Sequence, residues 1–114
     1  QGQPSLGDID LELRRQGFIP HCFAAVKQLP IAPWVVGGNP RRPFTQLLEA
    51  DMVYVRDFAH PELMSDEQLK HFALIVHHCY GSHDLALRCV MLLEQRQALE
   101  AGAQHSYQQF LAKP

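Results

Sequence analysis

The sequence of 114 residues contains no apolar run near the roughly 20 residues that a membrane-spanning helix requires. It also has no excess of charge of either sign, because 10 Lys and Arg residues are set against 12 Asp and Glu, for a formal net charge of -2. A nucleic-acid or anionic-membrane partner favours a basic patch, so the net charge predicts neither. We therefore expect no membrane span and no nucleic-acid partner.

Cysteine is scarce too. The three cysteines, Cys22, Cys79 and Cys89, are an odd number and show no zinc or redox spacing. Structural disulfides belong to oxidising compartments, so this pattern favours reduced thiols and a cytoplasmic protein. Internal repeats and low-complexity segments are also missing. The remaining composition, 46% hydrophobic and 19% charged, is that of an ordinary globular protein.

The first half of the chain, residues 1–58, alternates between helix and strand signals. Residues 8–16 predict a short amphipathic helix with acids in its first turn and arginines in its last, and Gly17 suits the left-handed position after it. Residues 18–23 and 51–56, rich in aromatic and β-branched side chains, predict two strands that pair antiparallel.

The connection between these strands is irregular. Residues 29–43 are rich in Pro and Gly, which interrupt regular structure and predict a long loop. Residues 44–50 then predict a helical turn before the second strand.

The second half, residues 59–114, predicts a helical hairpin and a third helix. Ser65 and Gln68 form a capping-box pattern in front of a helix over residues 66–80, which has apolar side chains at helical spacing. Gly81 ends that helix and Ser82 can cap the next. The second helix is expected over residues 83–101 and the third over residues 103–111.

The sequence around the hairpin turn contains three histidines, His77, His78 and His83. Successive helical residues point about 100° apart, so adjacent histidines do not supply the i and i+4 ligands of a helical zinc site. A zinc site formed by His77, His83 and Cys89 would need a coincidence that the spacing does not encode. The sequence therefore favours polar histidines near the hairpin tip and predicts no metal.

The second helix of the hairpin is apolar nearly all round from residue 85 to residue 93. Such a helix expects contacts on more than one side. One interpretation is a self-associating or partner-binding surface that includes Leu87, Val90 and Met91. The other is a central helix with the Pro-rich loop packed over it, and both remain open.

Several motifs resemble a known family. The segment GQPSLGDIDLELRRQGFIPHCF, residues 2–23, and the segment QLLEADMVYVRDF, residues 46–58, are similar to the C-terminal part of FkbM-type S-adenosylmethionine-dependent methyltransferases. The matching motifs are GQP at residues 2–4, LRRQGF at residues 13–18 and ADMVYVRD at residues 50–57. Residues 60–111 are similar to a helical extension that some bacterial members carry.

The resemblance implies an α/β fragment. Its strands would be the last two of a Rossmann-like seven-stranded sheet, the final one antiparallel, followed by the helical extension. The intact protein would transfer a methyl group from S-adenosylmethionine to a hydroxyl oxygen. The glycine-rich cofactor turn of such folds has no counterpart here, so no cofactor is expected in this chain alone. No cofactor-binding residue is assigned, and the catalytic residues stay unknown.

Long loops in compact domains are often functional, which makes residues 33–43 the best candidate for an acceptor-side loop. The residues chosen for substrate binding are Trp34, Asn39, Arg41 and Arg42. The two arginines could instead be an ordinary solvated pair. The expected partners are the remainder of the methyltransferase domain and a possible second copy. The alternative function is a helical interaction or dimerisation module without catalytic activity.

Overall fold

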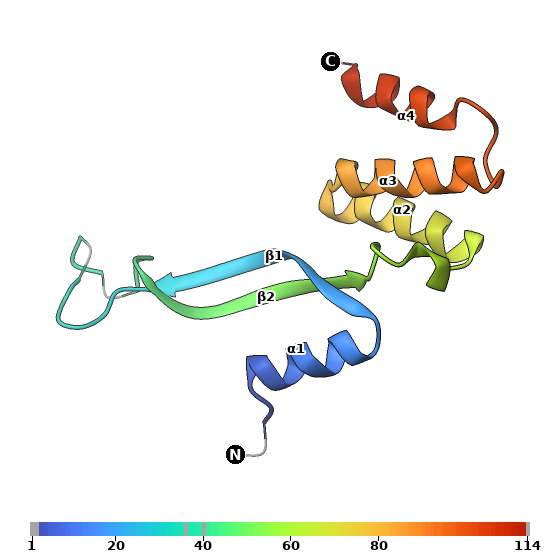
Figure 1. Cartoon of the computed structure of the whole chain (residues 1–114). Coiled ribbons are helices and arrows are strands. Elements are labelled where there is room, and N and C mark those ends of the chain that lie inside the picture. The colour runs from blue at the N-terminus through green and yellow to red at the C-terminus, as the bar shows by residue number, and fades with distance from the viewer. Residues whose placement is uncertain (1–2, 36, 40, 114) are drawn as a thin grey trace. The chain divides into compact units, whose positions relative to one another are not determined.

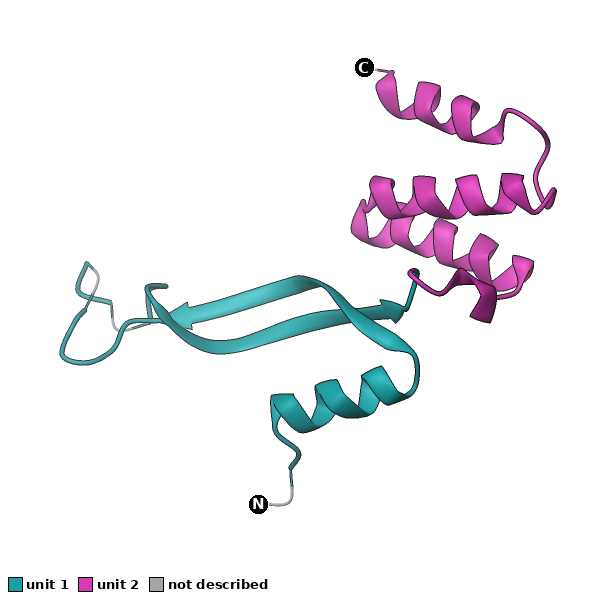
Figure 2. Cartoon of the chain, viewed as in Figure 1, with its two compact units in different colours: residues 1–58 teal, residues 59–114 magenta. Residues whose placement is uncertain are grey.

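The structure is a computed structural model that describes residues 3–35, 37–39 and 41–113. Over these residues the chain is a small α/β protein with two antiparallel strands and four α-helices (Figure 1). It divides into two compact units, residues 1–58 and residues 59–114, which are described separately (Figure 2). In the part of the chain that the structure describes, no helix is long and apolar enough to cross a membrane.

The first unit opens with helix α1 (Leu6–Arg15). It begins two residues earlier than the sequence predicts because Ser5 and Asp8 form a capping box. The Asp8 amide donates to Ser5 Oγ at 3.1 Å, and the Ser5 amide donates to the Asp8 carboxylate at 3.1 Å. After the helix, Gly17 adopts a φ of 89°, which confirms the predicted left-handed residue.

Strands β1 (Phe18–Leu29) and β2 (Gln46–Arg56) form the predicted antiparallel pair. Both are longer than predicted. The helical turn expected over residues 44–50 is wrong, because residues 46–50 belong to β2 and pair with residues 26–29 of β1. Their Leu, Glu and Ala side chains favour helix, but the ladder of backbone hydrogen bonds overrides that preference.

Helix α1 lies beside the hairpin (Figure 1), and a polar contact joins the two. The Tyr54 hydroxyl on β2 donates to Asp10 Oδ1 at 2.6 Å, and Arg14 Nε donates to Asp10 Oδ2 at 2.8 Å. Among the described residues of this unit, Val55 alone is buried. A two-stranded sheet with one buried side chain has little core of its own.

The second unit holds the remaining buried side chains. Helix α2 (Asp66–Tyr80) begins with the predicted capping box, in which Ser65 Oγ accepts from the Gln68 amide at 3.1 Å and Gln68 Oε1 accepts from the Ser65 amide at 2.9 Å. Gly81, with a φ of 62°, follows it as predicted. The core of this unit consists of Met64, Leu69, Phe72, Val76, Leu85, Ala86, Cys89 and Leu93.

Helix α3 (His83–Gln95) lies between α2 and α4 (Ala103–Ala112) (Figure 1). The prediction that it continues to residue 101 is wrong. Gln97 takes a left-handed φ of 61°, and its amide donates to the Glu94 carbonyl at 2.9 Å. The Ala98 amide donates to the Leu93 carbonyl at 2.9 Å. These two bonds are a Schellman motif, normally built on glycine.

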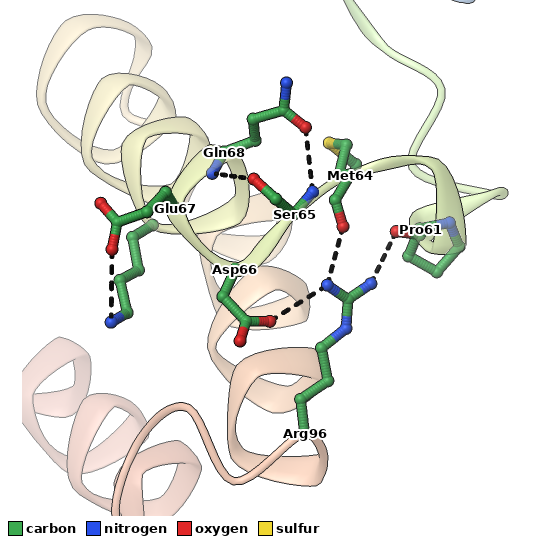
Figure 3. A network of polar contacts seen from close by, with 8 residues as sticks. Pro61, Met64, Ser65, Asp66, Glu67, Gln68 and Arg96 are labelled. Atoms are coloured by element: carbon green, nitrogen blue, oxygen red, sulfur yellow. Dashed lines mark hydrogen bonds and ion pairs between the residues drawn. The ribbon is translucent and has the colours of Figure 1, made fainter.

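Arg96, the first residue after α3, connects the end of α3 to the start of this unit (Figure 3). Its guanidinium donates to the carbonyl of Pro61 at 2.6 Å, to the carbonyl of Met64 at 2.8 Å and to the carboxylate of Asp66 at 3.2 Å. The two carbonyls belong to the first residue of the 3₁₀ turn η1 (Pro61–Leu63) and to the residue that follows it. Arg96 therefore fixes the entry of α2 against the end of α3.

At the N-termini of α3 and α4, the N-cap residue itself makes no side-chain capping hydrogen bond. Ser82 occupies the N-cap of α3, but its side chain makes no capping hydrogen bond, so that expectation is wrong. Gly102 at the N-cap of α4 has no side chain, and Glu94 takes over this role. Its carboxylate accepts from the amides of Gln104 at 2.7 Å and Gly102 at 3.3 Å, which lowers the Glu94 pKa.

Candidate functional site

All four residues predicted to bind substrate lie in the connection between β1 and β2, residues 30–45, which we call the hairpin tip. Trp34 is 59% exposed, and its ring stacks on that of Phe44 with centroids 5.8 Å apart. Phe44 was not singled out from the sequence, because a stack across ten residues of irregular loop has no periodic signal.

The polar residues of the hairpin tip form local turns instead of a converging site. Asn39 Oδ1 accepts from the Arg41 amide at 2.9 Å. The Arg42 guanidinium lies over Gly37, so close that a β-carbon at Gly37 would lie 3.1 Å from Arg42 Nη1. Within the described residues, no cation–π contact joins Trp34 to either arginine. The structure thus pairs Asn39 with Arg41 but does not gather the four residues around one point.

A shallow depression lies beside the hairpin tip, on the strands. Its polar lining comes from Lys27, Gln28, Glu49 and Asp51, and Lys27 Nζ lies 3.4 Å from Glu49 Oε1. Trp34, Asn39, Arg41 and Arg42 are not among its lining residues. Apart from Pro43, its lining belongs to the strands, and it offers no pocket for the predicted set.

Of the glycines in the sequence, the pair Gly37 and Gly38 is the most similar to a glycine-rich cofactor turn. Both have positive φ, 59° and 75°, and lie in an exposed turn. The next element after this turn is strand β2, whereas nucleoside-cofactor sites of α/β folds place the glycines between a strand and a helix N-terminus. The described residues around Gly37 do not fit S-adenosylmethionine, so we derive no step through it.

The histidines at the turn between α2 and α3 lie together. The rings of His78 and His83 have centroids 4.7 Å and 4.9 Å from that of His77. His77 Nδ1 lies 2.6 Å from the hydroxyl of Tyr107, which comes from α4. Burial lowers the pKa of His77, and the neighbouring His78 and His83 lower it further. Tyr107 lies 30 residues beyond His77, so the contact depends on how α4 packs.

A metal is a poor match for this cluster. In the described part of the chain, no three His, Cys, Asp or Glu side chains are arranged to hold a metal ion. Cys89, the third ligand of the hypothetical zinc set, is buried in the core of the helical unit. Burial raises its pKa to about 11, which keeps it a thiol near neutral pH.

The three residues predicted to form an interface, Leu87, Val90 and Met91, are half-buried on α3. The helix contacts α2 on one side and α4 on another. Helices α2 and α4 therefore cover part of its apolar circumference, and the predicted interface stays a prediction.

Comparisons with protein-family models, with curated proteins and with solved structures gave no match. The functional argument therefore rests on the chain itself.

Proposed function

We propose that this chain is the C-terminal portion of an S-adenosylmethionine-dependent, O-directed methyltransferase. Its strands would form the edge of a Rossmann-like sheet, and its helical unit would be an extension after that fold. The proposal starts from the GQP, LRRQGF and ADMVYVRD motifs of the sequence. The element order supports it, since a helix, a strand, a long loop and an antiparallel strand follow one another as the resemblance implies.

One observation carries the proposal furthest: the first unit leaves most of its apolar surface exposed. Each of its two strands is an edge strand, and Val55 is its one buried side chain among the described residues. Leu6, Phe23 and Leu48 are more than half exposed. Two strands and a helix rarely suffice for independent stability, so such a unit is expected to pack against further strands and helices.

In this arrangement the hairpin tip would border the methyl acceptor. Trp34, exposed and stacked on Phe44, would supply an apolar platform, and Asn39, Arg41 and Arg42 would supply hydrogen-bond donors and positive charge. The cofactor and the residues that activate the acceptor hydroxyl would come from the part of the sheet that precedes these residues. We assign no catalytic residue in this chain.

The test is calorimetric titration of S-adenosylmethionine into two proteins. One is the 114-residue chain and the other is the same chain extended upstream by a Rossmann half-domain encoded in the same reading frame. The expected result is binding to the extended protein alone. Binding to the 114-residue chain would overturn the conclusion that its residues do not fit the cofactor. Absence of binding by both would overturn the methyltransferase proposal.

A further inference from the structure

Charge is unevenly distributed along this chain although the formal net charge is only -2. No Asp or Glu occurs between Glu12 and Glu49, a stretch that spans all of β1 and the hairpin tip. Lys27 in β1 pairs with Glu49 at 3.4 Å. The hairpin tip itself contains two positive charges, Arg41 and Arg42, and no acid at all. This end of the hairpin is therefore cationic.

The same end is strongly apolar. Ile31 is 58% exposed, Trp34 59%, Val35 46% and Phe44 45%. They belong to the hairpin tip, which follows the end of β1, roughly 40 Å from the Gly17 turn at 3.3 Å per strand residue. Figure 1 shows this connection at the end of the strands, away from helix α1. Large apolar side chains at the end of a projecting hairpin, beside two arginines, mark an interaction surface.

We propose that the hairpin tip docks onto an anionic lipid surface. Trp34 and Phe44 would lie at the level of the headgroups, where amphipathic aromatic rings are favoured, and Ile31 and Val35 would reach the acyl boundary. Arg41 and Arg42 would contact the anionic headgroups. Each arginine would strengthen binding through its positive charge. This is binding to a membrane surface and requires no membrane-spanning helix.

The side-chain chemistry favours a bilayer over other anionic partners. Nucleic acid is held mainly by phosphate contacts, and the hairpin tip has only two cations for that purpose. Aliphatic side chains such as Ile31 and Val35 gain little from phosphates but are stabilised on leaving water for hydrocarbon. The inference does not depend on the methyltransferase proposal. It gives Trp34, Arg41 and Arg42 a lipid surface as their partner in place of a methyl acceptor, and it uses only the exposed side chains of the hairpin tip.

Trp34 is the one tryptophan of the chain, so its fluorescence reports directly on the hairpin tip. The full chain is titrated with vesicles of phosphatidylcholine that contain roughly one-third phosphatidylserine, the class of anionic lipid that attracts basic segments. Expected are a blue shift of the Trp34 emission, protection from aqueous quenchers, and co-sedimentation with the vesicles. Raising the salt concentration should weaken binding, since exposed charges are screened.

Two pairs of variants distinguish binding through the hairpin tip from non-specific adsorption of the whole protein. The double variant Arg41→Gln, Arg42→Gln should bind these vesicles about 25-fold more weakly, at about five-fold per cation. The matched control Arg15→Gln, Lys70→Gln removes the same charge from α1 and α2, where both side chains are exposed and weakly paired, at 3.6 Å and 3.9 Å. It should retain wild-type binding.

The second pair of variants tests whether apolar side chains of the hairpin tip insert into the membrane surface. The double variant Ile31→Ser, Val35→Ser keeps the fluorophore and should weaken binding about tenfold, because burial of each side chain is lost. The control Leu6→Ser, Leu11→Ser removes two exposed leucines of α1 and should leave binding unchanged. Circular dichroism of all four double variants checks that the helices persist.

Several outcomes would overturn the proposal. These are no blue shift and no sedimentation with the anionic vesicles at low salt, or equal losses in the tip variants and their controls. A blue shift that grows with protein concentration without vesicles would indicate self-association of the hairpin tip instead. An equal response to a single-stranded oligonucleotide would indicate a general polyanion site and would also reject a lipid surface.

Discussion

The hydroxyl of Tyr54 on β2 donates a hydrogen bond of 2.6 Å to the carboxylate of Asp10 on α1. It joins residues 44 positions apart and holds the helix on the hairpin. The hydrogen bond from Tyr54 lowers the Asp10 pKa, and the one from Arg14 lowers it further. Because the pKa of Asp10 is lower in the folded state, this contribution to stability is present above the ordinary carboxyl pKa of about 3.9. It is lost as the pH falls below that value.

We therefore expect Tyr54→Phe to loosen α1. Amide hydrogen exchange over residues 6–15, followed by mass spectrometry at neutral pH, should become faster, and the Asp10 pKa should rise toward its ordinary value. Tyr80→Phe removes a hydroxyl from the other unit and is the control. Unchanged exchange in Tyr54→Phe would show that α1 is held by its apolar contacts alone.

Arg96 should contribute more to stability than any exposed cation of the helical unit. Its guanidinium donates to two carbonyls and one carboxylate, and Arg96→Ala leaves these acceptors without their partner. We expect a loss of about 2 kcal/mol in the free energy of unfolding, measured by urea denaturation followed by helical ellipticity. Lys70→Ala, whose ion pair with Glu67 is 3.9 Å long and exposed, should cost less than about 0.5 kcal/mol. Equal losses would contradict the assigned role of Arg96.

Replacement of Gln97 by glycine should stabilise the helical unit. The Gln97 φ of 61° is strained for a residue with a β-carbon, and glycine removes that strain at the cost of some unfolded-state entropy. We expect Gln97→Gly to raise the free energy of unfolding by about 0.5–1 kcal/mol. Gln95→Gly, two residues earlier and still helical, should lower it by a similar amount. The opposite signs can be read from one pair of urea titrations, and a loss in both variants would exclude the Schellman geometry.

The histidine cluster predicts a decline in stability on acidification. The pKa of His77 is lowered by burial, then by His78 on its own helix and His83 on α3, while Tyr107 faces it from α4. A lowered histidine pKa means that the unfolded state binds the proton first. The contribution is therefore complete above the ordinary pKa of about 6.5 and is lost as the pH falls below it.

Replacement of His77 by Asn should flatten this dependence. Thermal unfolding between pH 8 and pH 5 should show a smaller drop in Tm for His77→Asn than for the wild type. His105→Asn removes an exposed histidine of α4 and should leave the drop unchanged. A wild-type Tm that is constant over this range would contradict the prediction.

Local rules explain what could be predicted from the sequence. The Ser65–Gln68 capping box and the left-handed Gly81 depend on residues within one turn of each other, and both were anticipated. The end of α3 could not be predicted. Its left-handed residue is Gln97, and only a glycine at that position would have marked the end of the helix in the sequence. Residues 46–50 were misassigned because their partners lie some twenty residues away in β1.

The same limit applies to the candidate site: its residues could be chosen from the sequence, but their contacts could not be predicted. Trp34, Asn39, Arg41 and Arg42 were chosen one by one for their chemistry, and all four lie in the hairpin tip. Their contacts could not be anticipated, since an irregular loop has no period from which neighbours can be inferred. The Phe44 stack and the Tyr107 contact with His77 depend on tertiary packing, which a single sequence does not encode locally.

The uneven distribution of buried side chains has a consequence for how this chain denatures. Eight of the nine buried core residues lie in the helical unit and one, Val55, lies in the hairpin unit. The helical unit should therefore be the more stable of the two, and the hairpin unit should open first. Under limited proteolysis the hairpin unit should be digested first. A resistant helical fragment close to residues 59–113 should then accumulate.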